Sequence, residues 1–473
     1  MAGRIEKDSL GEKQVPADAY YGIQTARAVE NYPISGWRAH PRLIEAYMYQ
    51  KKASALANRD AGAIQPQVAN AIARACDEIL AGALRDQFVV DVFQAGAGVS
   101  QHMNTNEVLA NRAIEILGGK RGDYTVVHPN DHVNFGQSTN DTYPTAMRVA
   151  ALLSERDLAQ TMIALEKALD AKGREFDHIL KSGRTHLQDA VPIRLGQEFF
   201  AYARAIERGR KALREACRHA EELGIGGTAA GTGLNTAPGY REKTISLMQE
   251  FTRLDLRPSP DMREAMQSNL PMAAVASALK NVSLELIRIT NDLRLLASGP
   301  ITGMAELLLP AVQPGSSIMP GKVNPAILEM AAMVGFQVAG NAAVVDYAVQ
   351  AGQLELNVMM PAMAFNILMS FEITKNCMST LTTRCIEGLK ADEARCRRFA
   401  ELSPSIVTAL NPYIGYAKGA EVVKEALKTG RTIPEVVKEK KLMSDEQLSR
   451  VLDPIKMTEP GITGQESTNK EGR

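Results

Sequence analysis

The sequence predicts an all-α protein whose centre is an elongated bundle of five long helices. Its composition favours helices, because aromatic residues make up only 5% with a single Trp, while Ala, Leu and Met are plentiful. Five stretches place apolar residues at the i, i+3/i+4 spacing of a helix face. The segments between them are rich in Gly, Pro and polar residues, which is typical of loops.

The five expected helices occupy the middle of the chain. Three of them open with a Pro or directly after one, and Pro is a favoured residue of the first helical turn. At about 30 residues each, such helices span roughly 45 Å. Their expected bounds are 144–179, 191–223, 270–296, 325–347 and 361–389.

The third of these helices predicts that the chain assembles with copies of itself. Between Met272 and Leu284 it carries apolar residues on nearly all sides. A helix with this pattern must be buried on all sides. In a thin bundle, other subunits supply that burial most easily, so we expect a homo-oligomer.

Charge and cysteine usage exclude several classes of function. Lys plus Arg and Asp plus Glu both number 54, so the formal net charge is zero, and we expect no nucleic-acid partner. We find no run of about 18 uncharged apolar residues and no apolar segment at the N-terminus, so we expect no membrane partner. The five scattered cysteines fit reduced structural thiols in a cytoplasmic protein.

The loop GSSIMPGKVNP (315–325) carries the strongest chemical signal. It combines two hydroxyls, Ser316 and Ser317, with the cation of Lys322 and the amide of Asn324. The last Pro of the loop begins the next helix, so a helix N-terminus adds positive potential nearby. This set suits a carboxylate whose charge grows during a reaction, although a Ser acts as a base only where its alkoxide is stabilised. The alternative is a Gly-rich turn with a surface Lys.

Further polar segments border the long helices. Residues 136–141 (GQSTND) precede the first one, as at an N-cap that faces an anion, with simple capping as the alternative. Residues 183–189 (GRTHLQD) place His186 in a polar loop between two long helices, where an acid/base or binding role competes with a structural one. We expect His128 and His132 to serve turn geometry rather than to bind a metal.

Several motifs together resemble one known family. GSSIMPGKVNP is similar to the signature loop of the aspartase/fumarase superfamily, and GQSTND, GRTHLQDA, GTGLN, NEVLANRA and GQLELNV resemble its other segments in the same order. The resemblance runs from about residue 8 to about residue 463. Within the superfamily, the chain resembles aspartate ammonia-lyases more than class II fumarases at PADAYYGIQTARAVENYPISG (16–36), at Ser138-Thr139-Asn140 and at GQLELN (352–357).

The resemblance implies a carbon–nitrogen lyase that reversibly eliminates ammonia from L-aspartate to give fumarate, with class II fumarase as the alternative. It assigns catalytic roles to Ser316 as the base, to His186 beside the leaving amino group and to Glu329 as the carboxylate partner of that His. The substrate-binding residues that it implies are Ser138, Thr139, Asn140, Thr185, Ser317, Met319, Lys322 and Asn324. It implies no cofactor and no metal, because the protein's own donors stabilise the enediolate intermediate.

The resemblance also implies three helical domains, at 1–141, 142–392 and 393–473. The central domain is expected to assemble four subunits around a shared core. In the resulting homotetramer, residues of three subunits build each active site. The expected partners are therefore a small dicarboxylate or amino-acid substrate and further copies of the chain.

Two positions depart from the family pattern. Val99 replaces a Thr whose hydroxyl normally contacts the substrate, and His102 replaces an expected Asn. Either the neighbouring polar side chains compensate in a working aspartase, or the pocket serves a substituted aspartate or succinate. A catalytically silent structural protein is a further alternative. The joint presence of the candidate Ser, Lys, Asn and His argues against it.

Overall fold

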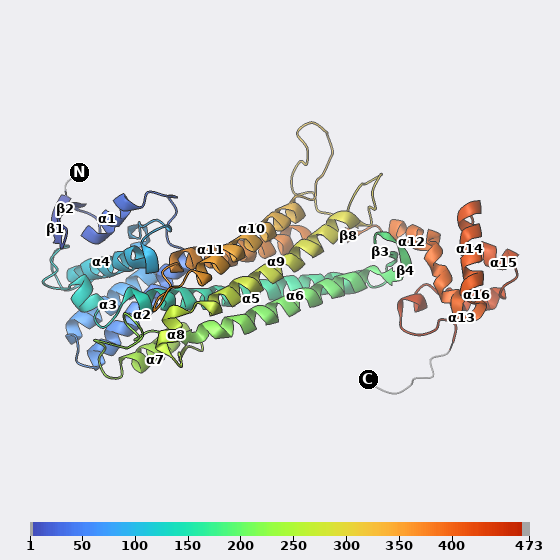
Figure 1. The fold of residues 1–473 in the computed structure, drawn as a ribbon. Helices are drawn as coiled ribbons and strands as arrows, with labels where there is room; N and C mark the ends of the chain where they lie inside the picture. The colour runs from blue at the N-terminus through green and yellow to red at the C-terminus, as the bar shows by residue number, and fades with distance from the viewer. Residues whose placement is uncertain (1–2, 466–473) are drawn as a thin grey trace. The chain divides into compact units, whose positions relative to one another are not determined.

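The computed structural model describes residues 3–465 and is dominated by helices (Figure 1). The five long helices predicted from periodicity are present. They are α5 (Thr139–Glu175), α6 (Leu195–Arg218), α9 (Leu270–Leu296), α10 (Ala326–Gln350) and α11 (Met360–Leu381). The predicted all-α class is therefore confirmed. Pro144 lies inside α5 rather than at its start, because the helix already begins at Thr139.

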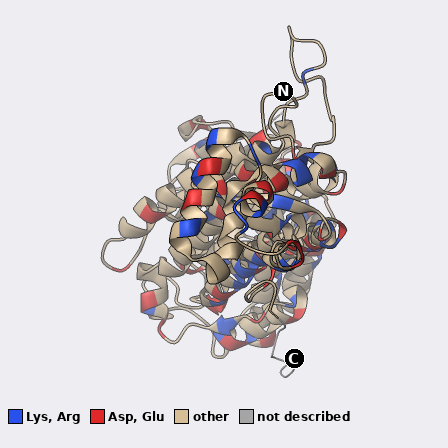
Figure 2. Ribbon diagram, turned by 90° about the vertical axis from the view of Figure 1, so that its right-hand side faces the viewer, with Lys and Arg blue, Asp and Glu red and all other residues tan. Residues whose placement is uncertain are grey.

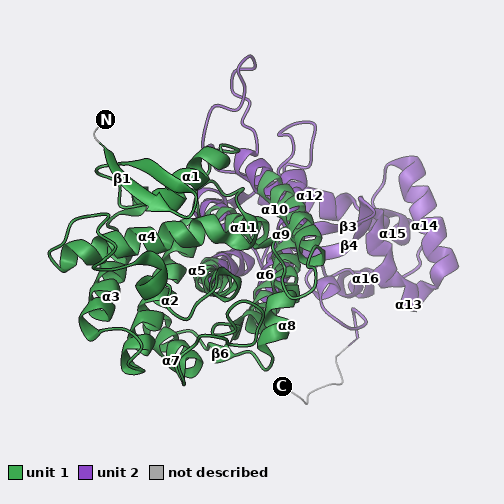
Figure 3. Cartoon of the chain, turned by 60° about the vertical axis from the view of Figure 1, so that its left-hand side comes forward, with its two compact units in different colours: residues 1–161, 208–285, 333–376 green, residues 162–207, 286–332, 377–473 purple. Residues whose placement is uncertain are grey.

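The chain divides into two compact units, coloured in Figure 3. Unit 1 comprises residues 1–161, 208–285 and 333–376, and unit 2 comprises residues 162–207, 286–332 and 377–473. Each of the five long helices therefore contributes residues to both units. This division does not test the expected domain boundaries at 141/142 and 392/393, which stay a prediction.

Unit 1 contains the N-terminal elements and the loop after α6. Its helix α2 packs against α3 and α7, and α3 also packs against α4. A short β-ladder pairs β1 with β2 in antiparallel register, and β5 pairs with β6 in parallel. The bounds are β1 (Gly3–Asp8), β2 (Gly11–Pro16), α1 (Ile23–Asn31), α2 (Pro41–Asp60), α3 (Pro66–Leu80), α4 (Val99–Ile116), β5 (Glu222–Leu223), α7 (Tyr240–Thr252), β6 (Arg257–Pro258) and α8 (Met262–Gln267).

Unit 2 contains a hairpin, a long loop and the C-terminal helices. The last helices bury their own apolar cluster, which includes Leu410, Val422 and Val436. The bounds are β3 (Leu180–Thr185), β4 (Gln188–Arg194), β7 (Leu307–Leu308), β8 (Lys390–Ala391), α12 (Glu393–Leu402), α13 (Asn411–Ile414), α14 (Tyr416–Thr429), α15 (Ile433–Glu439) and α16 (Asp445–Val451).

The hairpin β3–β4 corrects the sequence-based expectation of a polar loop followed by a helix from Val191. The two strands pair antiparallel, with Thr185 opposite Gln188. The turn residues between them, His186 and Leu187, have φ values of 56° and 58°. A two-residue turn with positive φ at both positions matches the twist of a hairpin, although neither residue is a Gly. Periodicity missed the hairpin because its polar residues mask the strand pattern.

Two of the long helices are long and apolar enough to be candidate membrane spans by length and composition, although neither contains a run of 18 uncharged apolar residues. They are α9 and α10, with mean hydropathies of 1.3 and 1.4. Apolar core helices of other proteins pass the same test, and 44% and 39% of the two windows are buried within the chain itself. The other residues of each helix are partly or fully exposed in the isolated chain. In the view of Figure 2, acidic and basic residues are interspersed rather than separated.

A buried charge cluster fixes the base of the hairpin in unit 2. The carboxylate of Glu306, which is fully buried, accepts hydrogen bonds from both terminal nitrogens of Arg184 at 3.0 and 2.8 Å. The buried Lys181 ammonium lies 3.2 Å from the same carboxylate and 2.8 Å from Glu198. Since Lys181 and Arg184 both belong to β3, one carboxylate holds the strand that leads to Thr185 and His186.

We predict that Glu306→Gln destabilises the protein strongly. The change keeps the shape of the side chain but removes the negative charge that pairs with Lys181 and Arg184. We expect the free energy of unfolding to fall by about 3 kcal/mol or more. Thermal unfolding followed by circular dichroism measures it. Glu393→Gln is the matched control, because Glu393 pairs with Arg397 on a half-exposed surface and its loss changes little. Equal melting temperatures for the two variants would contradict this account of the hairpin.

Candidate active site

The N-terminus of α5 presents three of the predicted substrate-binding residues. Ser138 caps the helix, because its Oγ accepts a hydrogen bond from the Asn140 backbone N–H at 3.2 Å. Asp141 in turn accepts the Ser138 backbone N–H at 3.1 Å, so a side chain also satisfies the residue before the helix. Ser138, Thr139 and Asn140 are partly exposed, whereas Asp141 is buried. The capping expected from the sequence is present, and the helix end carries positive potential.

Asp141 also ties this helix end to the Gly-rich loop that follows β5. Its second oxygen accepts backbone N–H groups of Gly226 at 3.1 Å and Thr228 at 2.9 Å. Asn140 donates its side-chain N–H to the Ala229 carbonyl at 2.8 Å. Gly226 has a φ of +87°, a conformation that L side chains rarely adopt. Burial raises the pKa of Asp141 to about 7, against the lowering effect of these hydrogen bonds and of the Lys51 charge.

A buried lysine lies behind Thr139, and no local sequence pattern indicates it. The Lys51 ammonium is 2.7 Å from His102 Nε2, and His102 Nδ1 is 2.6 Å from Thr139 Oγ1. Burial lowers the pKa of Lys51 to about 7, with the negative charge of Asp141 acting in the opposite direction. Burial and the Lys51 charge hold the pKa of His102 well below its usual range. His102, noted above only as a departure from the family, is therefore a neutral contact of a candidate site residue.

Val99 is the first residue of α4, directly after Gly98. A Cβ at Gly98 would lie 2.0 Å from the Tyr143 ring, so the backbone approaches this ring closely before the helix starts. The Val99 side chain is 42% exposed and offers no hydrogen bond. Its neighbour Gln101 is fully buried, and neither atom of its side-chain amide has a partner. Of the polar residues that follow Val99, His102 contacts Thr139, whereas the buried amide of Gln101 contacts no candidate site residue among those that the structure describes.

The signature loop belongs to unit 2. Ser316 Oγ accepts the backbone N–H groups of Met319 at 2.8 Å and Ile318 at 3.3 Å. Two such donors stabilise negative charge on the oxygen, which is the condition set above for a Ser base. Asn324 donates to the Gly315 carbonyl and so closes the base of the loop. Among the described residues, none pairs with the exposed Lys322 ammonium.

The other predicted residues of this unit are also exposed. Ser317 and Met319 lie on the outside of the loop, and Thr185 and His186 form the exposed tip of the hairpin. Glu329 lies in the first turn of α10, 3.8 Å from Arg294. Within one chain its charge partner is therefore Arg294, and no hydrogen bond or ion pair joins it to His186 among the described residues. The carboxylate–histidine pairing stays a prediction.

The segment at 352–357 connects two of the long helices. The buried Asn357 donates to the carbonyls of Ala348 and Val349 at 3.0 and 2.9 Å, and it accepts the Met359 backbone N–H. It therefore joins the end of α10 to the start of α11. Gln353 is exposed.

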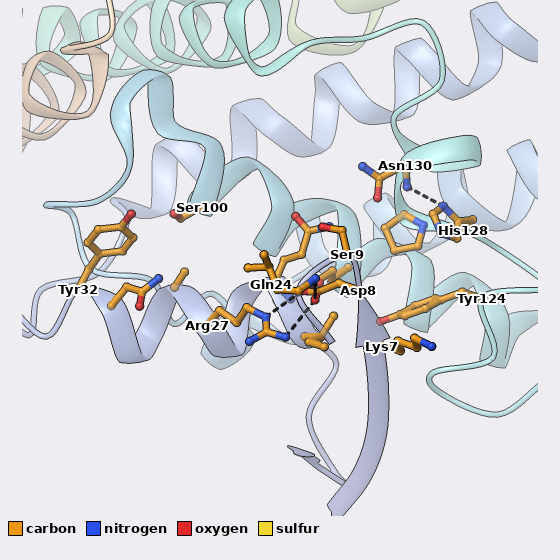
Figure 4. A pocket seen from close by; sticks show the side chains of 16 residues that line it. Lys7, Asp8, Ser9, Gln24, Arg27, Tyr32, Ser100, Tyr124, His128 and Asn130 are labelled. Carbon is orange, nitrogen blue, oxygen red and sulfur yellow. Dashed lines mark hydrogen bonds and ion pairs between the residues drawn. The ribbon is translucent and has the colours of Figure 1, made fainter. Parts of the chain in front are cut away.

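A separate pocket of about 430 Å³ in unit 1 contains none of the predicted site residues (Figure 4). The ion pair of Arg27 and Asp8 crosses it at 2.8 Å. His128 lies at its edge and accepts the backbone N–H groups of Asn130 and Asp131, so it serves turn geometry as expected. In the part of the chain that the structure describes, no group of three or more His, Cys, Asp or Glu side chains is placed to hold a metal ion.

The helical fold, the Ser316 oxygen that accepts two backbone N–H groups and the hydroxyl-bearing N-terminus of α5 are the features expected above for a lyase. Comparison with known families agrees. The lyase family matches residues 11–340, and the C-terminal domain of fumarase C matches residues 406–459. The chain therefore belongs to the aspartase/fumarase superfamily of lyases.

Relatives of two activities cover nearly the whole chain. It is 46% identical over 467 residues to the aspartate ammonia-lyase of Bacillus subtilis, covering 99% of this chain and 98% of the relative. It is 48% identical over 466 residues to the class II fumarate hydratase of Halobacterium salinarum, covering 98% and 99%.

Solved structures of the superfamily match equally well. A fumarate lyase/delta crystallin from Brucella melitensis, solved with cobalt, superimposes with a TM-score of 0.94 at 46% identity, covering 97% of this chain and 100% of that one. A class II fumarase from Schistosoma mansoni gives a TM-score of 0.93 at 34% identity, covering 97% and 99%. These similarities fix the family and leave the choice of substrate to the site.

Proposed function

We propose that the chain is an aspartate ammonia-lyase, a carbon–nitrogen lyase that reversibly converts L-aspartate to fumarate and ammonia. The observation that carries the chemistry is the Ser316 oxygen with two backbone N–H groups directed at it. The aspartate ammonia-lyases at 45–46% identity over nearly the whole chain support the substrate. Within the superfamily, Thr139 and Gln353 favour this reaction over hydration.

The difficult step is removal of a proton from the carbon beside a carboxylate. In the proposed mechanism the Ser316 alkoxide takes this proton, and its charge is tolerable because Ile318 and Met319 donate to it. The β-carboxylate then gains negative charge, which Ser138, Thr139 and Ser317 stabilise. Donors fixed in place before the reaction stabilise such charge without reorganisation, which is the largest single contribution in many enzymes.

The remaining predicted residues bind the other end of the substrate. Lys322 and Asn324 hold the α-carboxylate. The Lys322 ammonium suits this role because it is exposed and has no charge partner among the described residues. Asn140, Thr185 and His186 surround the leaving amino group, and Met319 forms a wall. The chain's own donors stabilise the intermediate, so no cofactor takes part in the proposed mechanism.

The proposed assembly is a homotetramer with composite sites. The exposed apolar residues Met333, Phe336, Val344 and Tyr347 recur along α10 at helical spacing on one face, 43–71% exposed. Gly340 lies on the same face, and nothing lies within 4 Å of where its Cβ would be. A single apolar stripe at this spacing suits close packing against another helix. A helix surrounded by lipid needs apolar residues on every exposed side, whereas α10 also exposes Asp346 and Gln350.

Exposure of the catalytic candidates also supports composite sites. A pocket that strengthens charge interactions has to exclude water. The signature loop and the hairpin tip have none of this shielding from their own unit. Neighbouring subunits supply it in the proposed tetramer, and there Glu329 of one chain reaches His186 of another. We further propose a cytoplasmic location, which the five free and buried cysteines favour.

Class II fumarase is the second candidate, because a fumarate hydratase shares 48% identity with the chain. Val99 favours a third, related reaction on a substituted aspartate or succinate. Losing a hydrogen bond to a charged group costs about 1.5–3 kcal/mol, so the missing hydroxyl weakens the transition state for aspartate unless another donor replaces it.

We predict that purified protein forms fumarate from L-aspartate and not from L-malate. Ultraviolet absorbance of fumarate measures both reactions in the same buffer. Fumarate from malate alone would move the assignment to fumarase. Absence of fumarate from both substrates would refute the proposed reaction and direct the search to substituted aspartates and succinates.

We also predict that Ser316→Ala abolishes turnover while the oligomer stays intact. The hydroxyl is the proposed base, and its removal takes nothing from the apolar stripe of α10. Initial rates and light scattering measure the two properties. Ser405→Ala is a matched control elsewhere in unit 2, where the hydroxyl only donates to the Asp189 carbonyl. Turnover by Ser316→Ala at the control's rate would rule out the base assignment.

A further inference from the structure

The environment of Lys51 fixes the direction of a chain of hydrogen bonds that ends at Thr139. The Lys51 ammonium has three N–H donors and three neighbours at hydrogen-bond distance. These are Asn134 Oδ1 at 3.0 Å, Gln137 Oε1 at 2.9 Å and His102 Nε2 at 2.7 Å. Lys51 itself is fully buried, so no proton of its ammonium is left for water.

Two of the three neighbours can only accept. The Asn134 side-chain N–H donates to the backbone carbonyl of Gln137 at 3.2 Å, so the side-chain oxygen of Asn134 faces Lys51. The Gln137 side-chain N–H donates to the carbonyls of Val133 and Phe135 at 3.1 and 3.3 Å, with the same result. The third proton of Lys51 is therefore directed at His102 Nε2, which must be unprotonated to accept it.

With Nε2 unprotonated, the neutral imidazole of His102 carries its proton on Nδ1. This proton points at Thr139 Oγ1, 2.6 Å away. Thr142, the other hydroxyl near the ring, donates its proton to the Ser138 carbonyl at 2.7 Å and so does not donate to the ring. Its oxygen lies 3.4 Å from Nδ1, so the Nδ1 proton is directed at the much closer Thr139 Oγ1. Thr139 Oγ1 thus accepts from His102, and its own proton is free to point out of the protein.

We propose that Lys51 and His102 are positioning residues that orient the Thr139 hydroxyl as a donor to the substrate carboxylate, and that loss of a proton from Lys51 reverses this orientation. When Lys51 passes its proton to His102 Nε2 and one proton leaves the chain of groups at the Thr139 end, the neutral Lys51 amine has a lone pair that accepts a hydrogen bond from Nε2–H. With its proton on Nε2, the neutral ring has an unprotonated Nδ1, which accepts a hydrogen bond from the Thr139 hydroxyl. Thr139 keeps its proton, but the hydroxyl turns away from the substrate. The inference rests on the proposed function of Thr139 as a substrate-binding residue.

The groups that face Lys51 allow this change near neutral pH. The buried carboxylate of Asp141 on α5 favours the ammonium, whereas burial favours the amine. Cys76 on α3 stays a thiol, since burial raises its pKa far above the usual value. The ring of Tyr47 on α2 stacks on His102 with centroids 5.9 Å apart and is itself buried, which keeps its pKa well above neutrality. The remaining contacts of Lys51 are His102 on α4 and the side chains of Asn134 and Gln137, and none of them carries a charge.

The experiment compares His102→Leu, His102→Asn and Thr139→Val by kcat/KM for L-aspartate. At pH 6, we expect His102→Leu and Thr139→Val each to lower kcat/KM about tenfold, and the double variant to be no worse than Thr139→Val. His102→Asn keeps a donor near the position of Nδ1 and retains activity within about threefold. His219→Asn, an exposed histidine of the same unit, is the control. Circular dichroism and light scattering exclude misfolded variants.

The pH profile separates this role from a purely structural one. Asn has no second tautomer, so the ratio of wild-type to His102→Asn kcat/KM should fall severalfold as the pH rises through about 7. A ratio that is constant between pH 6 and pH 8.5, or additive losses in the double variant, would overturn the proposal.

A second measurement distinguishes failure of the proposed reaction from failure of the proposed role of Lys51 and His102. If L-aspartate gives no fumarate, binding of succinate is measured by calorimetry with the same variants over the same pH range. Weaker binding by His102→Leu, with the pH dependence described above, supports the orientation of Thr139 for a carboxylate of another substrate. Equal binding by wild type and His102→Leu, or no binding, overturns it.

Discussion

The buried carboxylate of Asp141 is the contact on which the arrangement of unit 1 depends. It accepts the backbone N–H of Ser138 at the start of α5 and those of Gly226 and Thr228 in the Gly-rich loop. A carboxylate in such a place would be costly to bury alone, and both the N–H groups and the charge of Lys51 offset that cost. The same anion that fixes the helix end thereby retains a cation behind Thr139.

This constraint explains why hydroxyl, amide and imidazole groups meet at one helix N-terminus. Asp141 accepts the Ser138 backbone N–H, and Ser138 accepts the Asn140 backbone N–H. The Thr139 side chain then contacts His102, and the Asn140 side chain donates to the Ala229 carbonyl. In unit 2 the corresponding anchor is Glu306, which secures the strand leading to the hairpin tip. In both units a buried carboxylate holds backbone in place while the side chains proposed for chemistry stay exposed.

The sequence predicted the parts of the molecule that depend on local pattern. The five long helices follow from apolar periodicity, and the capping of α5 follows from the run of short polar residues. The hairpin at 180–194 was missed, because its two-residue turn uses His186 and Leu187 at positive φ in place of the Gly or Asn that signal such a turn. The search for long uncharged apolar runs did not select α9 and α10, because Lys280 interrupts α9, and Glu329 and Asp346 limit the uncharged run of α10.

The candidate site divides in the same way. Its residues were identified from motifs, and the donors to Ser316 follow from the short loop that carries it. Lys51 was not foreseeable, since a Lys on a helix is usually exposed and nothing local in the sequence marks this one as buried. The role of His102 could not be predicted either, because it depends on the contact with Lys51, which lies in a distant segment of the chain. The pairing of Glu329 with His186 depends on assembly, which no single chain contains.

Formation of each active site from different subunits is the central claim, and mixing two inactive variants tests it most directly. Ser316→Ala and Asn140→Ala tetramers are dissociated together, reassembled and assayed with L-aspartate. If the two residues of one site come from different chains, hybrids contain some sites with both residues intact, and random mixing restores about a quarter of wild-type activity. No recovery, with hybrid tetramers shown to form, would mean that Ser316 and Asn140 act within one chain and would contradict the composite site.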